Sequence, residues 1–164
     1  MSWITIFLTI VLATIATEVF AWWLHRHVMH GWAWKWHKSH HEKHDDHFEL
    51  NDAFSLIFAA LAIALLVAGQ IGPLWEPVFW AGIGVCVYGA LYVFVHEILT
   101  HRRLPIRWQP KSGYLKRLVD AHHLHHVSRR SDVGVSFGFL YTPPVHVLRK
   151  RLKKIARSEL QDTQ

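Results

Sequence analysis

Residues 25–47 read HRHVMHGWAWKWHKSHHEKHDDH and carry eight histidines in twenty-three residues. This segment follows directly on a long apolar run. Imidazole is a strong ligand for zinc, copper, iron and nickel, and so many imidazoles exceed what solubility requires. Taken alone, the segment leaves two interpretations open: a metal site, or a solvated histidine-rich tail of low complexity.

The second half of the chain repeats the spacing of the first. Each half contains H-x4-H and then H-x2-H-H, with a gap of six residues between the two elements in the first half and twenty in the second. A low-complexity tail does not explain this repetition, so we predict a site for two metal ions. Its ten ligands are His25, His30, His37, His40, His41, His96, His101, His122, His125 and His126. The other five histidines, His27, His44, His47, His123 and His146, lie outside the repeat.

Three apolar runs, residues 3–24, 53–71 and 78–95, dominate the rest of the first hundred residues. Each is close to the roughly 20 residues that cross a bilayer as a helix. Buried helices of a soluble protein are the alternative, but three such runs in 164 residues leave too little polar surface for it. We therefore predict an all-α integral membrane helical bundle with three, or at most four, spans, forming one domain over residues 1–164.

The basic residues predict the orientation of the bundle. All eighteen lysines and arginines lie within residues 24–52 or after residue 95. Lysine and arginine favour the cytoplasmic side of a membrane, so we expect the N-terminus outside, and the C-terminus and both histidine elements in the cytoplasm. Tryptophans favour the membrane interface, and five of them surround the end of the first run: Trp22, Trp23, Trp32, Trp34 and Trp36.

Helix geometry constrains how the histidines meet. The H-x2-H-H spacing places three rings on one face of an α-helix. His25 and His30 are five residues apart, which is about 140° on a regular α-helix, so they cannot face one ion from it. We expect the helix to end or bulge near residues 28–31, with Gly31 as the stop, and a similar irregularity between His96 and His101.

Acidic residues are candidates for supporting roles. Glu18 is the only ionisable group in the first apolar run and lies two helical turns before His25. We expect its carboxylate to accept the proton of that ligating imidazole and fix its tautomer, the alternative being that Glu18 snorkels or pairs elsewhere. Five polar residues follow the first cluster, and we expect most to be solvated and some to support ligands: Asp45, Asp46, Glu49, Asn51 and Asp52.

Three further segments have local predictions. Residues 102–111 are basic with two prolines, which indicates an interfacial loop, or alternatively a lid or partner site. Residues 133–140 are apolar but broken by glycine, which indicates a re-entrant or interfacial piece near the site. Residues 145–160 form an amphipathic basic pattern that predicts a helix on the membrane surface. Cys86 is the only cysteine, which excludes an internal disulfide and an iron–sulfur cluster.

The chain resembles the integral-membrane di-iron hydroxylases of the fatty-acid hydroxylase superfamily, and within it the bacterial β-carotene 3-hydroxylases. The stretches that carry the resemblance cover most of residues 20–144. Besides His25, they are HGWAWKWHKSHH at 30–41, FELNDAFS at 48–55, YGALYVFVHEILTHRR at 88–103, AHHLHH at 121–126 and SFGFLYTPP at 136–144.

The resemblance implies a non-haem di-iron monooxygenase of the bacterial inner (cytoplasmic) membrane. The ten repeated histidines would bind two iron ions, and O2 would be the co-substrate. The implied reaction hydroxylates C3 of each β-ionone ring, converting β-carotene through β-cryptoxanthin to zeaxanthin. The carotenoid would arrive from the bilayer, electrons would come from a separate ferredoxin-type donor, and no nucleic acid would be involved.

Three alternatives remain open from the sequence. The same chemistry on a fatty acyl chain or a sterol is the first. A bis-imidazole haem carrier is the second, although its ligands would pair within the membrane, whereas these lie beyond the apolar runs. A metal transporter is the third, and it would need polar groups along the spans, where Glu18 is the only ionisable one.

Overall fold

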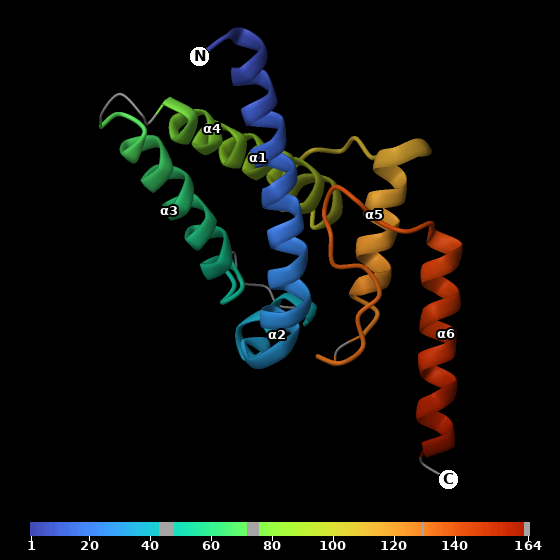
Figure 1. Cartoon of the computed structure of the whole chain (residues 1–164). Helices are drawn as coiled ribbons and strands as arrows, with labels where there is room; N and C mark the ends of the chain where they lie inside the picture. Colours follow the sequence, from blue (N-terminus) through green and yellow to red (C-terminus); the bar gives the residue numbers. More distant parts are fainter. Residues whose placement is uncertain (43–47, 72–75, 129, 163–164) are drawn as a thin grey trace.

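The computed structural model describes residues 1–42, 48–71, 76–128 and 130–162, and these form helices joined by irregular segments without any strand (Figure 1). The predicted all-α class is confirmed for the described chain. The elements in order are α1 (Trp3–Leu24), η1 (His25–Trp32), α2 (Trp34–His41), α3 (Asp52–Ala68), α4 (Glu76–Tyr92), η2 (Val93–Thr100), α5 (Gly113–His125) and α6 (Val145–Asp162).

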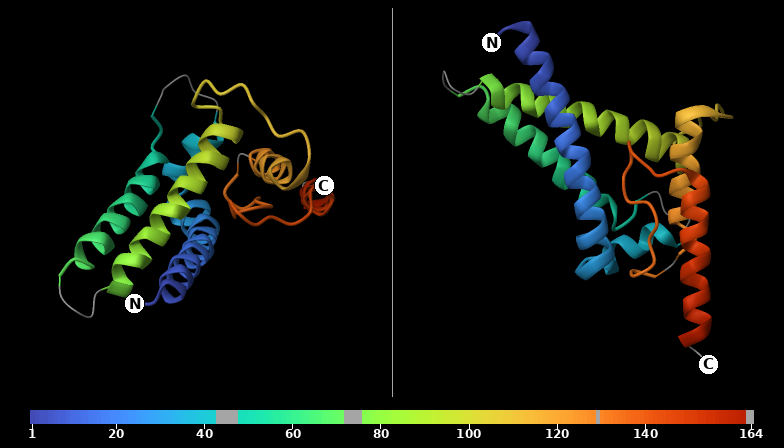
Figure 2. Two further views of the ribbon diagram at one scale, coloured as in Figure 1. Left: turned by 90° about the horizontal axis from the view of Figure 1, so that it is seen from above. Right: turned by 45° about the vertical axis from the view of Figure 1, so that its right-hand side comes forward.

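Helices α1, α3 and α4 form one layer, with α4 packed against both of the others (Figures 1 and 2). The α1–α4 contact is close because Gly84 has no side chain: a Cβ there would lie 2.6 Å from the Ala13 Cβ. The Thr14 hydroxyl donates to the Gly84 carbonyl across this contact at 3.0 Å. Small residues and such hydrogen bonds are the usual means by which helices associate in a membrane.

The outer surface of this layer is apolar. Phe7, Leu12 and Val19 on α1 are each more than half exposed, as are Ile57 and Val67 on α3. Two continuous helices, Trp3–Trp32 and Glu76–Thr100, are long and apolar enough to cross a membrane. Helix α3 has 17 residues and is about 25 Å long, somewhat short of a roughly 30 Å hydrocarbon core.

The expected irregularity between the paired histidines is confirmed in both halves. Each long helix changes from α to π geometry where its H-x4-H element lies, in η1 and η2. The His101 amide donates to the His96 carbonyl five residues back at 2.9 Å, and Gly31 leaves helical geometry at φ −105°, ψ −125°. A π turn brings residues five apart onto one side, so the rings of each pair lie 5.2 Å (His25 and His30) and 4.4 Å apart.

Helices α5 and α6 pack together beside the layer formed by α1, α3 and α4 (Figure 2). Leu148 on α6 is fully buried in a cluster with Ala121 on α5 and with Val135, and Leu152 and Ile155 pack against the same cluster. The apolar stripe of α6 therefore faces the protein, and the location of residues 145–160 on a membrane surface stays a prediction. An amphipathic pattern marks a buried face, and here the protein itself supplies the covering surface.

Candidate metal centre

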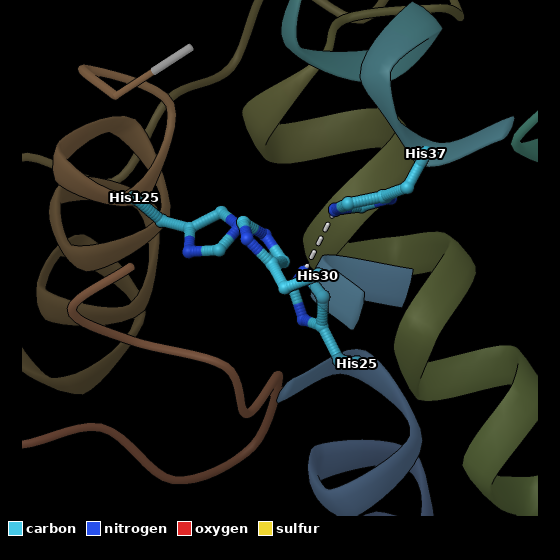
Figure 3. A group of neighbouring side chains, drawn as sticks. All are labelled: His25, His30, His37 and His125. Atoms are coloured by element: carbon cyan, nitrogen blue, oxygen red, sulfur yellow. Dashed lines mark hydrogen bonds between the residues drawn. The ribbon is translucent and has the colours of Figure 1, made fainter. Parts of the chain in front are cut away.

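All ten repeated histidines converge at one end of the layer formed by α1, α3 and α4, in two adjoining groups. Four rings of the first group, from η1, α2 and α5, point toward one another (Figure 3). The first histidine group comprises His25, His30, His37 and His125, with His41 against His37. The second histidine group comprises His40, His101, His122 and His126, with His96 against His40.

The rings of the first histidine group are held mainly by backbone carbonyls. His25 Nδ1 lies 2.8 Å from the Phe137 carbonyl oxygen, and His30 Nδ1 lies 3.0 Å from that of Ser131. Both carbonyls belong to the strap, residues 131–142, which joins the α5 region to α6. His41 Nδ1 is 2.8 Å from the Ser128 carbonyl just before the strap. The prediction that residues 133–140 lie near the site is confirmed.

Side chains at the start of α3 and in η2 hold three further rings. Asn51 Oδ1 accepts from His37 at 2.7 Å. Glu49 accepts from His40 at 2.9 Å, and Glu97 accepts from His96 at 2.6 Å. Of the five polar residues considered from sequence, Glu49 and Asn51 support rings directly and Asp52 binds Arg103, while Asp45 and Asp46 lie outside the described residues.

This arrangement fits bound cations. Each of these acceptors is a carbonyl or carboxylate oxygen, so Nδ1 carries the hydrogen and the Nε2 lone pair is free. Yet Nε2 atoms face each other at 3.0 Å for His25 and His37, 3.0 Å for His40 and His96, and 3.2 Å for His37 and His41. Facing lone pairs repel unless a cation lies between them. Two ligand nitrogens about 2.1 Å from one ion would be separated by about this distance.

Each histidine group draws four of its rings from one half of the chain and the fifth from the other half. Four members of the first group come from the first half and one, His125, from the second. The second group mirrors this, with His40 as its one member from the first half. His40 and His125 occupy the same middle position of the repeated H-x2-H-H element. Each candidate metal site therefore needs both halves of the chain.

Burial keeps these imidazoles neutral. It lowers the pKa of His101 to about 3, with the neighbouring Arg103 charge adding to the effect. Burial and the other rings also lower the pKa of His40 and His122 well below the usual value for histidine. Since neutral imidazole is the form that binds metal, both groups are ready to bind at neutral pH.

The predicted hydrogen bond between Glu18 and His25 is wrong. His25 donates to Phe137 instead, and Glu18 Oε1 accepts the backbone amides of residues 139–141 of the strap at 3.0, 2.9 and 3.1 Å. A Cβ on Gly138 would lie 2.7 Å from this oxygen, so the close approach requires glycine. Glu18 therefore binds the strap, and the strap in turn supplies the carbonyl that accepts from His25.

Replacing Glu18 with glutamine is expected to lower activity several-fold more than it lowers folded protein. The amide retains one acceptor oxygen but loses the charge that strengthens three hydrogen bonds to the strap. Product per folded molecule should be compared with that of Thr9→Val, an exposed position on the same helix. Unchanged activity per folded Glu18→Gln molecule would show that the charge does not position the strap.

The histidines outside the repeat do not join either group where the structure describes them. His27, His123 and His146 are exposed, and His27 packs against Trp22 and Trp23. His44 and His47 lie outside the described residues.

Two residues near the site had no assigned role in the sequence predictions. Glu97 directly follows His96 and accepts from it, and Arg103 binds Asp52 at 2.8 Å, Glu97 at 3.1 Å, and Glu49. The sequence feature that could have identified both residues is their position next to the second H-x4-H element. The rest of residues 102–108 is exposed, as an interfacial loop would be.

An apolar cavity of about 660 Å³ lies between α1, α3 and α4. Its walls along α3 and α4 include Ala62, Leu66, Val85 and Gly89. At the end near the site its lining includes four polar or charged residues and two aromatic rings: Asn51, Asp52, Glu97, Arg103, Tyr92 and Phe139. Tyr92 stacks on the His96 ring at 4.6 Å, and Phe139 stacks on the His25 ring at 5.6 Å. Each histidine group therefore has one ring packed against an aromatic residue of the cavity lining.

The known proteins to which this chain is similar are named as hydroxylases. Residues 10–143 match the family model described as fatty acid hydroxylase. A beta-carotene hydroxylase of Pantoea ananas is 46% identical over 154 residues, covering 94% of this chain and 87% of that protein. One from Pseudescherichia vulneris is 51% identical over 134 residues, covering 82% and 75%. The chloroplastic beta-carotene 3-hydroxylase 1 of Arabidopsis thaliana is 36% identical over 152 residues, covering 92% and 46%. No solved structure gives a significant match.

Proposed function

Since the chain belongs to the fatty acid hydroxylase family, we propose that it is a membrane carotenoid hydroxylase that adds a hydroxyl group at C3 of β-ionone rings. β-Carotene would become β-cryptoxanthin and then zeaxanthin. The observation that carries the proposal is the apolar cavity whose lining includes Tyr92 and Phe139, the two rings packed against the histidine groups. Bacterial relatives named beta-carotene hydroxylases cover most of the chain and support the choice of substrate.

Two iron ions are the proposed cofactor, one in each histidine group. A ring methylene has no leaving group and no acidic proton, and bound iron would supply the O2 activation that its hydroxylation requires. The reaction consumes O2, two electrons and two protons, and yields the alcohol and water. The chain's own contribution is to orient five of the ten imidazoles through the strap, Glu49, Asn51 and Glu97, and a sixth, His41, through the Ser128 carbonyl.

The substrate is proposed to enter the cavity from the bilayer. The cavity's walls on α3 and α4 are apolar, and outside the cavity these helices expose Ile57 and Val87. A cyclic hydrocarbon end at the inner limit of the cavity would lie against Tyr92 and Phe139. A hydroxylase of fatty acyl chains or sterols remains the second candidate because the cavity's apolar lining accepts those lipids as well.

The electron donor is proposed to be a separate ferredoxin-type protein. The reaction needs external electrons, and the sequence carries one cysteine and no flavin, haem or iron–sulfur motif.

We place the chain in the bacterial inner membrane, with α1, α3 and α4 spanning it and both histidine groups facing the cytoplasm. The basic residues support this orientation. A reporter that works only in the periplasm should be inactive when fused at Gln164 and active when inserted between α3 and α4. A periplasmic reporter active at Gln164 would contradict the model.

The function is tested by expressing the chain in cells that make β-carotene. Zeaxanthin should accumulate, and the purified protein should contain iron without a haem Soret band. Liquid chromatography of the pigments and elemental analysis of the protein provide the two measurements. Unchanged β-carotene with hydroxylated fatty acids or sterols would select the second candidate.

A further inference from the structure

The two histidine groups differ in the charge of the groups that hold their rings. In the first, the acceptors of the Nδ1 hydrogens are neutral: the carbonyls of Ser128, Ser131 and Phe137, and the amide of Asn51. In the second, two rings donate to carboxylates, His40 to Glu49 and His96 to Glu97. Glu18, which contacts the strap from α1, accepts from backbone amides there and from none of the ten rings.

Arg103 binds the acidic residues into one cluster. Its guanidinium contacts Glu49, Asp52 and Glu97, which come from two separate parts of the chain. Among the described residues, this cluster places three carboxylates and one guanidinium beside the second group. Burial works to lower the pKa of Arg103, but its hydrogen bonds with Asp52 and Glu49 outweigh it and raise the pKa above the usual value. The Glu49 side chain is almost fully buried, at 7% exposure, so water screens its charge weakly.

A carboxylate that accepts the Nδ1 hydrogen makes the opposite nitrogen of the ring more basic. Outer partners of this kind commonly change metal affinity by about 10- to 100-fold. The nearby negative charge also favours the more highly charged state of a bound ion. A neutral carbonyl or amide acceptor orients the ring in the same way but has a much smaller effect on its charge.

We infer that the chain builds two unequal metal sites, in which the second histidine group binds its ion more tightly and stabilises its oxidised state more than the first. The inference rests on the proposed function because it requires that both groups bind metal. Glu49 and Glu97 are then positioning residues that act through His40 and His96, and Arg103 holds both carboxylates in place.

The test removes ferrous iron from the purified full-length protein, without oxygen, with a coloured ferrous chelator. Wild-type protein should release one ion first and the second only at a chelator concentration at least about tenfold higher. The double variant Glu49→Gln, Glu97→Gln keeps acceptor oxygens but loses both charges, and its two releases should merge. Asn51→Asp adds a carboxylate behind His37 and should shift the first release to a higher concentration. Glu42→Gln, at an exposed glutamate paired with Lys38, should leave both releases unchanged.

Two single-site variants assign the releases. His40→Ala should leave the more weakly bound ion, and His125→Ala the more tightly bound one. Mössbauer spectra of protein loaded with iron-57 should show two distinct signals that become more similar in the double glutamine variant. If the double variant does not fold, the iron release of Glu97→Gln alone and of Asn51→Asp still tests the inference. The first should bring the two releases closer together, and the second should do so by shifting the first release.

Release of both wild-type ions in a single step would overturn the inference. The inference would also fail if the glutamine changes weakened binding of the ion that remains in His40→Ala protein, because that ion belongs to the first histidine group. A protein that binds no iron would instead refute the proposed function.

Discussion

Replacing His40 with alanine is expected to abolish hydroxylation and to remove the ion of the second histidine group, although His40 lies in the first half of the chain. The reason is the exchanged position: His40 Nε2 is 3.0 Å from His96 Nε2, and the His40 ring is 4.3 Å from that of His101. Loss of a ligand also leaves the other buried rings facing each other without a cation. Iron per protein should fall from about two toward one, and activity by more than the roughly 100-fold that loss of an outer partner can cause.

Double variants test whether His40 belongs to the second histidine group or whether each half of the chain forms its own metal site. His40→Ala combined with His96→Ala should lose no more iron than either change alone, because both belong to the second group. His40→Ala combined with His25→Ala should lose both ions. His123→Ala, an exposed neighbour on α5, is the matched control and should keep normal iron and measurable activity. The opposite pattern in the two double variants would show that each half of the chain forms its own site.

Filling the cavity is expected to abolish product while leaving iron in place. Gly89 lines the cavity on α4, and a Cβ added there meets no atom within 4 Å, so Gly89→Phe projects into open space. A carotenoid end and the phenyl ring would compete for one volume, and zeaxanthin yield should fall at least about tenfold because pocket shape controls binding. Gly89→Ala should stay near wild type in both yield and iron, because a methyl group occupies little of the cavity.

A second variant on a different helix controls for the possibility that Gly89→Phe lowers yield by disturbing the fold. Ala62→Phe enters the cavity from α3 and should give the same result. Normal zeaxanthin yield from both phenylalanine variants, with iron retained, would show that the substrate binds elsewhere.

The sequence by itself determined which residues gather and why the helices must change geometry. The repeated spacing separated ten histidines from the other five, and all ten lie in the two groups. The five-residue spacing of His25 and His30 required a break in the α-helix, and η1 and η2 provide it. Both conclusions follow from local geometry, since helix periodicity fixes which near neighbours in the chain share a face.

Only the tertiary structure decided how the rings are divided and held. His40 and His125 join the group of the opposite half because α2 and α5 approach each other, and spacing along the chain contains no information about that approach. The same limit explains the Glu18 error: its position relative to His25 was right for a contact, but the strap, more than one hundred residues later, supplied both the competing acceptor for His25 and three amides for Glu18. The covering of α6 by α5 and the cavity beside α4 are likewise products of long-range packing.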